Sequence, residues 1–112
     1  MQIISEPALL KMVWENREVD FTEMMKIVVD IEREILAIDG DMHADLEKML
    51  LESGSLQQNL WGANIYPSKE NDEFLEFTSF INIRPSQENR GMEIMDTRIR
   101  EKISFIVQKL LK

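Results

Sequence analysis

Residues 97–111, TRIREKISFIVQKLL, decide the fold more than any other stretch of the sequence. Their apolar side chains recur at spacings of three and four, which places them on one stripe of an α-helix. The stripe consists of Ile99, Ile103, Ile106, Val107, Leu110 and Leu111. Asp96 precedes it and is a good N-cap, because its carboxylate can accept a hydrogen bond from the first turn. An amphipathic helix must bury its stripe, so the rest of the chain has to supply an apolar surface.

The surface predicted upstream is a β-sheet. Residues 60–66 and 74–85 flank a polar loop, as the two strands of a long hairpin do. Side chains alternate along the second strand: Phe77, Ser79, Ile81 and Ile83 face one way, and Glu76, Thr78, Phe80, Asn82 and Arg84 face the other. Pro85 would end the strand, since proline has no N–H to donate to a neighbour.

Residues 21–38 give conflicting signals. Apolar residues spaced by three and four favour a helix, whereas dense β-branched residues and the following Asp39-Gly40 favour strands and a hairpin turn. We interpret 26–38 as strand. Residues 42–52 remain open between helix and strand, because helix-forming residues and an alternating pattern coexist there.

The amino-terminal segment predicts a short strand at 1–4 and a helix at 6–17. Ser5 is a suitable cap for that helix and Pro7 fits its first turn. Its shared apolar face consists of Leu9, Leu10, Val13 and Trp14. The predicted fold class is therefore α+β, with an antiparallel sheet of three to five strands in a meander. The carboxyl-terminal helix, together with the amino-terminal helix, is expected to cover it.

The composition limits the function classes. The chain has 112 residues, four Gly, three Pro and no linker-like tract, which predicts one domain over 1–112. Thirteen basic against 21 acidic residues give a net charge of −8, which argues against nucleic-acid binding. There is no cysteine, and no apolar run reaches the ~18–20 residues of a membrane span. We expect a cytoplasmic protein with no membrane partner.

Several short motifs resemble a family of small prokaryotic proteins of about a hundred residues whose function is unknown. The motifs are Val28-Val29-Asp30-Ile31-Glu32, His43-Ala44-Asp45, Gly54-Ser55, Leu60-Trp61-Gly62-Ala63-Asn64, Asn82-Ile83-Arg84-Pro85, Asn89-Arg90 and Met92-Glu93-Ile94. The resemblance covers nearly the whole chain but implies no activity. Members of that family often carry Gly near position 34 and at 39, where this chain has Glu34 and Asp39. Glycine there favours turns over a helix.

His43, Asp45 and Glu47 are the candidate catalytic residues. His43 is the only histidine. It shares a face with Glu47 in either a helix or a strand, and Asp45 joins them only in a strand. One imidazole with two carboxylates could perform acid–base chemistry or recruit a divalent ion. The alternative interpretation is a solvated acidic face. The sequence predicts no cofactor and no tightly bound metal, since a stable zinc site draws on more nitrogen or sulfur ligands.

A second cluster predicts ligand binding. Arg84 and Arg90 can present guanidinium forks to a carboxylate or phosphate, with Asn82 and Asn89 as neighbouring amide donors. The alternative is structural, with Arg84 paired to a carboxylate such as Glu76 or Glu93 and the amides satisfying the loop backbone.

The Trp61-Gly62-Ala63-Asn64 segment adds a further candidate. Gly inside a strand often marks a close approach, and Asn64 faces the same side as Gly62. Asn64 could present its amide to a ligand there. The alternative is that Trp61 belongs to the core and Asn64 bonds the backbone.

Three functional hypotheses follow. The first is a binding or interaction module that takes a small anionic molecule or a protein partner's carboxylates through the Arg84 cluster. The second is a hydrolase- or isomerase-like enzyme that uses His43 with nearby carboxylates, with or without a metal. The third is a structural homo-oligomer without pocket chemistry. One histidine, no cysteine and no phosphate-binding loop favour binding over catalysis.

Overall fold

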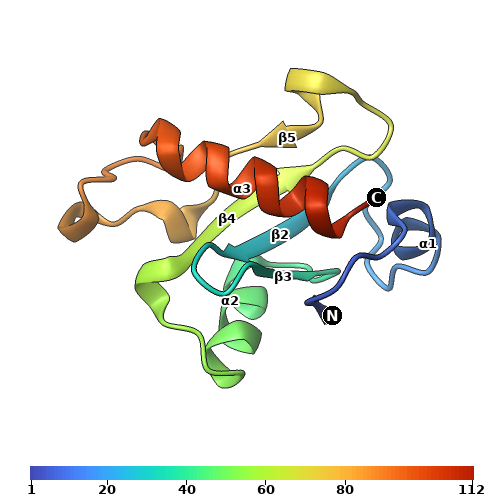
Figure 1. The fold of residues 1–112 in the computed structure, drawn as a ribbon, viewed down its shortest axis with the longest axis horizontal. Coiled ribbons are helices and arrows are strands. Elements are labelled where there is room, and N and C mark those ends of the chain that lie inside the picture. The colour runs from blue at the N-terminus through green and yellow to red at the C-terminus, as the bar shows by residue number, and fades with distance from the viewer.

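The computed structural model describes residues 1–112 as one antiparallel sheet with three α-helices (Figure 1). The strands are β1 (Gln2–Ile4), β2 (Met25–Asp30), β3 (Ile35–Ile38), β4 (Leu60–Ile65) and β5 (Leu75–Glu76), in the order β1-β3-β2-β4-β5. The helices are α1 (Leu10–Glu15), α2 (His43–Glu52) and α3 (Thr97–Leu110). The predicted α+β class is confirmed. The strand order is not a simple meander, because β1 lies beside β3 and β2 lies between β3 and β4.

Helices cover both faces of the sheet. Along β2, Ile27 and Val29 point into the larger core, where α3 packs, whereas Val28 points into a smaller core. Leu46 and Leu50 of α2 close this second core. In Figure 1, α3 crosses the front of the sheet and α2 lies on the other side. None of the helices has the length and apolarity needed to span a bilayer.

The terminal helices differ in how closely they match expectation. The Asp96 side chain caps α3 as predicted, accepting a hydrogen bond of 2.8 Å from the Arg98 N–H. The stripe is buried at Ile103, Ile106, Val107 and Leu110. The first helix is shorter than the predicted 6–17, because α1 begins after Leu9 rather than Ser5, and Leu9 is 62% exposed.

The conflict over 21–38 is settled in favour of a hairpin. β2 and β3 pair antiparallel around a turn at residues 31–34, so the turn comes before Asp39-Gly40. Asp30 organises it by accepting 2.9 Å hydrogen bonds from the N–H groups of Glu32 and Arg33. Glu34 and Asp39 have φ values of 55° and 71°, a region that glycine occupies more easily. Residues 42–52, which the sequence left open, are helical.

The predicted strand over 74–85 is wrong beyond Glu76. The chain leaves the sheet and forms short 3-10 helices at Phe80–Asn82 and Pro85–Gln87. The side-chain amide of Asn82 replaces a strand backbone: Oδ1 accepts from the Gly62 N–H at 2.8 Å, and Nδ2 donates to the Gly62 carbonyl at 2.9 Å. Gly62 is required because a Cβ there would lie 2.6 Å from the Cβ of Ser79.

Candidate functional site

Arg84, the centre of the predicted anion site, is 8% exposed and holds several segments together. An arginine has five N–H donors, and each has an acceptor in this structure. Nε donates to Ile81 O (3.1 Å), Nη1 to Gln57 O (2.7 Å) and Gln87 Oε1 (3.3 Å), and Nη2 to Glu47 Oε2 (3.4 Å) and Leu60 O. An anion could therefore bind here only by displacing one of these acceptors.

The carboxylate partner of Arg84 is Glu47, not Glu76 or Glu93 as the structural interpretation supposed. Both side chains are largely buried, with 8% and 14% of their surfaces exposed. Burial lowers the pKa of the Arg84 guanidinium, and the charge of Glu47 opposes that shift. Since the Arg84 carbon Cζ also lies 4.8 Å from the centre of the Trp61 ring, the guanidinium is enclosed by protein.

The neighbouring amides of the predicted anion site serve the backbone. The Asn82 side chain pairs with both backbone groups of Gly62, and its second amide hydrogen is donated to the Met92 carbonyl at 3.1 Å. Asn89 donates to the carbonyls of Asn82, Gly91 and Glu93 and accepts from the Met95 N–H. Arg90 alone among the five predicted ligand-binding residues is solvent-exposed. Asn82, Arg84 and Asn89 lie in one region, but their donors bond protein acceptors and do not converge on an open space.

The three candidate catalytic residues do not form one cluster either. Because 43–52 is a helix, Asp45 lies on a different side from His43 and Glu47, and Glu47 is committed to Arg84. His43 Nε2 lies 2.8 Å from the Ala63 carbonyl, which can only accept, so Nε2 carries the proton. Burial lowers the pKa of His43. No group of three or more His, Asp or Glu residues has an arrangement suited to a metal ion.

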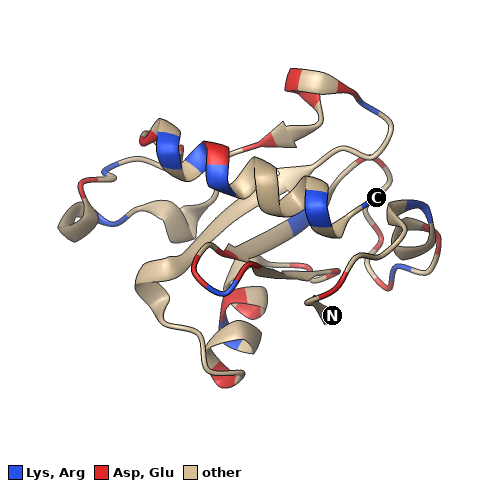
Figure 2. Ribbon diagram, in the orientation of Figure 1, with Lys and Arg blue, Asp and Glu red and all other residues tan.

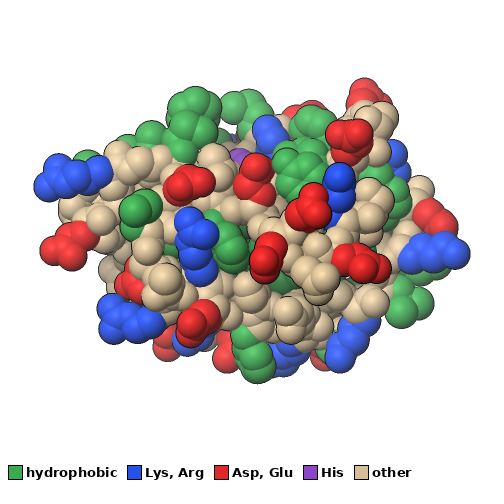
Figure 3. Space-filling view, turned by 90° about the horizontal axis from the view of Figure 1, so that it is seen from above, with side chains coloured by type: hydrophobic (Ala, Val, Ile, Leu, Met, Phe, Trp, Pro, Cys, Tyr) green, Lys and Arg blue, Asp and Glu red, His purple; other side chains and the backbone are tan.

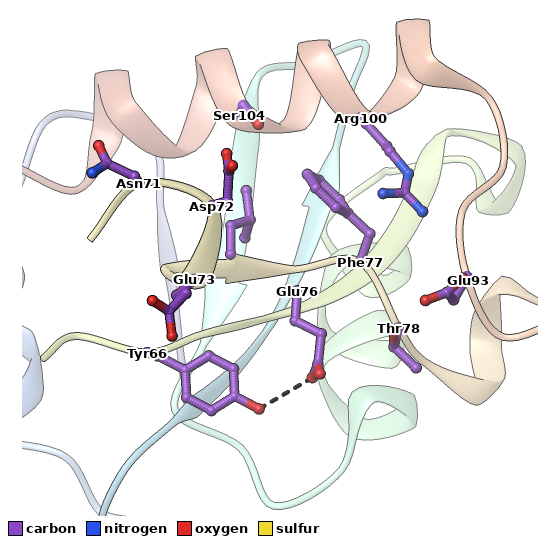
Figure 4. Close-up of a pocket in the computed structure, with 11 residues that line it drawn as sticks. Tyr66, Asn71, Asp72, Glu73, Glu76, Phe77, Thr78, Glu93, Arg100 and Ser104 are labelled. Atoms are coloured by element: carbon purple, nitrogen blue, oxygen red, sulfur yellow. Dashed lines mark hydrogen bonds between the residues drawn. The ribbon is translucent and has the colours of Figure 1, made fainter. Parts of the chain in front are cut away.

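Asn64 takes part in a different network, at the edge of the sheet. Its Nδ2 donates to Glu76 Oε1 at 2.8 Å and to the Thr78 carbonyl at 3.3 Å. The Tyr66 hydroxyl donates to the same Glu76 oxygen at 3.2 Å (Figure 4). Burial raises the pKa of Tyr66, and the charge of Glu76 adds to this, so the phenol stays protonated as a donor. Two donors therefore fix the Glu76 carboxylate in place.

Glu76 lines a cavity of about 470 Å³ that we call the acidic cavity. It lies between β5, the 3-10 turn Asn71–Glu73 and α3 (Figure 4). Its lining residues are Tyr66, Asn71, Asp72, Glu73, Leu75, Glu76, Phe77, Thr78, Glu93, Arg100 and Ser104. In Figure 4, Arg100 and Ser104 project from α3 towards β5, and the carboxylates come from the opposite side and the two ends.

The charge of the acidic cavity is strongly unbalanced. Four carboxylates line it, from Asp72, Glu73, Glu76 and Glu93, against the single guanidinium of Arg100. Figure 2 shows the acidic residues on the turn and on β5, and Figure 3 shows acidic side chains across the upper face with isolated basic ones between them.

Arg100 itself is engaged elsewhere. Its Nε donates to the Ile94 carbonyl at 2.5 Å, and its Cζ lies 4.9 Å from the centre of the Phe77 ring. Arg100 therefore neutralises one end of the acidic cavity and leaves the other end negative.

Of the residues that form this site, the sequence predicted only Asn64, which does not line the cavity but donates a hydrogen bond to Glu76. The sequence predicts only a polar hairpin loop between residues 66 and 74, and it places Glu76 on a strand as an alternative partner for Arg84. The sequence feature that could have predicted an acidic site is the net charge of −8, because so many carboxylates have to lie on the surface. It did not reveal which carboxylates the fold brings together.

Comparison with known proteins supports a family assignment without an activity. The family described as a protein of unknown function (DUF5674) matches residues 2–110. Neither a curated protein nor a solved structure matches the chain.

Proposed function

Because the chain belongs to DUF5674, a family of unknown function, its role has to be argued from its own side chains, and we propose that it is a binding module for a cationic organic group. The ligand is an amine or guanidinium on a short apolar stem, carried by a small molecule or a partner's side chain. It occupies the acidic cavity, with its charge among the carboxylates.

The observation that carries this proposal is the combination of four carboxylates with two aromatic rings around one hollow. Carboxylates attract an ammonium or guanidinium group, and aromatic faces favour cations within about 6 Å of the ring centre. Phe77 already accepts one guanidinium, that of Arg100, at 4.9 Å. Tyr66 lines the same hollow. The volume of about 470 Å³ falls in the usual range of small-ligand sites, roughly 300–1,000 Å³.

Preorganisation of Glu76 adds to this. Asn64 and Tyr66 both donate to Glu76 Oε1, so Oε2 of that carboxylate is available to a ligand. A carboxylate already held in place loses less conformational freedom on binding. The remaining carboxylates are exposed, so they add long-range attraction that salt screens.

The other two hypotheses receive less support. Catalysis through His43 lacks a convergent carboxylate, since Glu47 pairs with Arg84 and Asp45 faces elsewhere. An anion at Arg84 would have to displace an internal acceptor. The homo-oligomer stays a prediction, which sedimentation of the full chain can check.

The proposal is tested by titrating the protein with n-butylammonium, n-butylguanidinium and n-butyrate while backbone amide NMR signals are followed. We expect saturable shifts at residues 71–78 for the two cations and none for butyrate. Replacing Glu76 with Gln removes one charge at constant size and should weaken cation binding by about threefold. The matched control Glu101→Gln removes an exposed charge from α3 that does not line the cavity, and it should leave binding almost unchanged.

Two results would overturn the proposal. One is saturable binding of butyrate without binding of either cation, which would restore the anion hypothesis. The other is an equal loss of cation affinity in Glu76→Gln and Glu101→Gln, since that would show a diffuse charge effect rather than a site.

A further inference from the structure

Arg100 is the one basic residue that lines the acidic cavity, and most of its hydrogen-bond donors have no partner in the chain. Its Nε donates to the Ile94 carbonyl, and its Cζ lies 4.9 Å from the centre of the Phe77 ring. The terminal nitrogens Nη1 and Nη2 contact no acceptor, and Arg100 forms an ion pair with none of the four carboxylates that line the cavity. The four N–H groups of the guanidinium fork are therefore available.

Two contacts fix the direction of this fork. Arg100 lies in the first turn of α3, and Figure 4 shows it projecting from the helix towards the space between Phe77 and Glu93. Because the Ile94 carbonyl and the Phe77 ring already hold the planar group, it loses little freedom when it binds a ligand. Ser104 lies one turn further along α3 and lines the same cavity, where its hydroxyl adds a donor. The wall that α3 forms therefore offers hydrogen-bond donors.

The opposite wall of the acidic cavity offers acceptors. Asp72 and Glu73 belong to the 3-10 turn, and Glu76 belongs to β5. The apolar side chains of Leu75 and Phe77 line the same cavity. A donor wall on α3 thus faces an acidic wall on the turn and β5, with apolar surface available to a methylene chain.

This separation restricts the chemistry of an occupant. A guanidinium fork binds a carboxylate through two parallel hydrogen bonds. A simple carboxylate would meet Arg100 but would also face four carboxylates, and a phosphate would bring still more negative charge against them. A monoamine or a diamine would pair with the carboxylates but would leave the fork without an acceptor. A ligand with an ammonium group at one end and a carboxylate at the other satisfies both walls.

We propose that the acidic cavity binds an aliphatic amino acid whose ammonium and carboxylate groups are separated by a short methylene chain. The carboxylate accepts from Nη1 and Nη2 of Arg100, and the ammonium group lies among the carboxylates of the turn and β5. This inference rests on the function proposed above, because it adds a second contact to the same cationic ligand. It narrows the ligand from amines in general to amines that also carry a carboxylate.

The test compares ligands of equal chain length in the same amide NMR titration of the full chain. The four-carbon probes are 4-aminobutyrate, n-butylammonium and butane-1,4-diamine, and the six-carbon probes are 6-aminohexanoate, n-hexylammonium and hexane-1,6-diamine. For at least one length we expect the amino acid to bind about fivefold more tightly than the monoamine, because the fork adds charge-assisted hydrogen bonds. The amino acid should also bind more tightly than the diamine of that length.

Arg100→Lys keeps the positive charge and removes the fork. It should abolish the advantage of the amino acid and leave the affinity for the monoamine almost unchanged. The matched control is Arg98→Lys, since Arg98 is exposed on the same helix and does not line the cavity, and this variant should keep the advantage. A measurement on the wild type needs no variant to fold: 4-aminobutanamide and 6-aminohexanamide, in which a neutral amide replaces the carboxylate, should bind only as tightly as the monoamines.

The inference fails, and the proposed function stands, if the monoamines bind and neither amino acid binds more tightly. It also fails if the diamine binds most tightly at both lengths, since charge alone would then explain the affinity. Retention of the advantage in Arg100→Lys, or equal affinity of the amides and the amino acids, would show that Arg100 does not receive the carboxylate. If none of the amines and neither amino acid binds, the proposed function fails as well.

Discussion

The substitution Arg84→Lys tests whether Arg84 stabilises the fold or binds a ligand. The substitution keeps the positive charge beside Glu47, but it replaces a planar fork with a single ammonium group. Five acceptors surround the guanidinium, and three of them are backbone carbonyls, those of Gln57, Leu60 and Ile81. An ammonium group has three donors. At least two acceptors must therefore lose their partner.

The magnitude follows from that count. Each lost internal hydrogen bond costs about 1 kcal/mol net, and a carbonyl left buried without a donor costs more. We therefore expect Arg84→Lys to lower the free energy of unfolding by about 2–3 kcal/mol, which for a domain of this size corresponds to a drop in Tm of about 10 °C. Arg90 gives a matched control in the same loop. Since it is exposed, Arg90→Lys should change stability by less than about 0.5 kcal/mol.

Urea unfolding of both variants and wild type, followed by tryptophan fluorescence and circular dichroism, measures these differences. The comparison is valid only if the slope with urea is unchanged, because a changed slope signals a different unfolded or folded ensemble. An Arg84→Lys protein as stable as the Arg90→Lys protein would refute the reasoning. It would mean that the guanidinium contacts contribute nothing to the fold, and the anion hypothesis would then regain its main residue.

Four further outcomes are expected. Gly62→Ala should destabilise by about 1–3 kcal/mol in urea unfolding, because its Cβ would lie 2.6 Å from that of Ser79. Ile103→Ala should cost about 2–5 kcal/mol in the same assay, since the side chain is fully buried. Glu34→Gly should stabilise by about 0.5–1 kcal/mol, because it relieves a φ of 55°. Burial lowers the pKa of His43 below its ordinary value of 6.5, so the unfolded chain binds a proton more readily than the folded one. The stability that neutral His43 contributes is therefore present above pH 6.5 and is lost as the pH falls from 6.5 through the lower folded pKa. His43→Gln should flatten that pH dependence.

α3 could be predicted because its signals are local. Its period, its cap and its basic last turn lie within 97–111, and the structure confirms the Asp96 cap and the buried stripe. The hairpin at 25–38 needed a different signal. Val28 and Ala37 face one core, and Ile27, Val29, Leu36 and Ile38 face the other. A strand buried on both faces loses its alternation and becomes a continuous apolar run. Such a run cannot be told from a helix by period alone.

The segment after β5 shows why the second half of the sheet could not be predicted. Alternation over 77–84 suggested a strand, but Asn82 meets Gly62 with its side chain instead of its backbone. A side-chain amide has the same donor and acceptor as a peptide group, so it can end a ladder without leaving Gly62 unpaired. Nothing in the local sequence distinguishes this asparagine from one that faces solvent.

This use of side chains in place of backbone hydrogen-bonding partners also explains which polar side chains remain free to bind a ligand. Because residues 77–95 lack a continuous ladder, side chains pair part of their backbone, and Arg84, Asn82 and Asn89 supply donors to the carbonyls of Ile81, Met92 and Asn82. Residues that looked available in the sequence are thereby used within the fold. Glu93, at the rim of this irregular segment, remains exposed and lines the acidic cavity. The side-chain donors of this segment are used within the fold, while carboxylates remain at its rim, so the acidic cavity favours a ligand that donates hydrogen bonds.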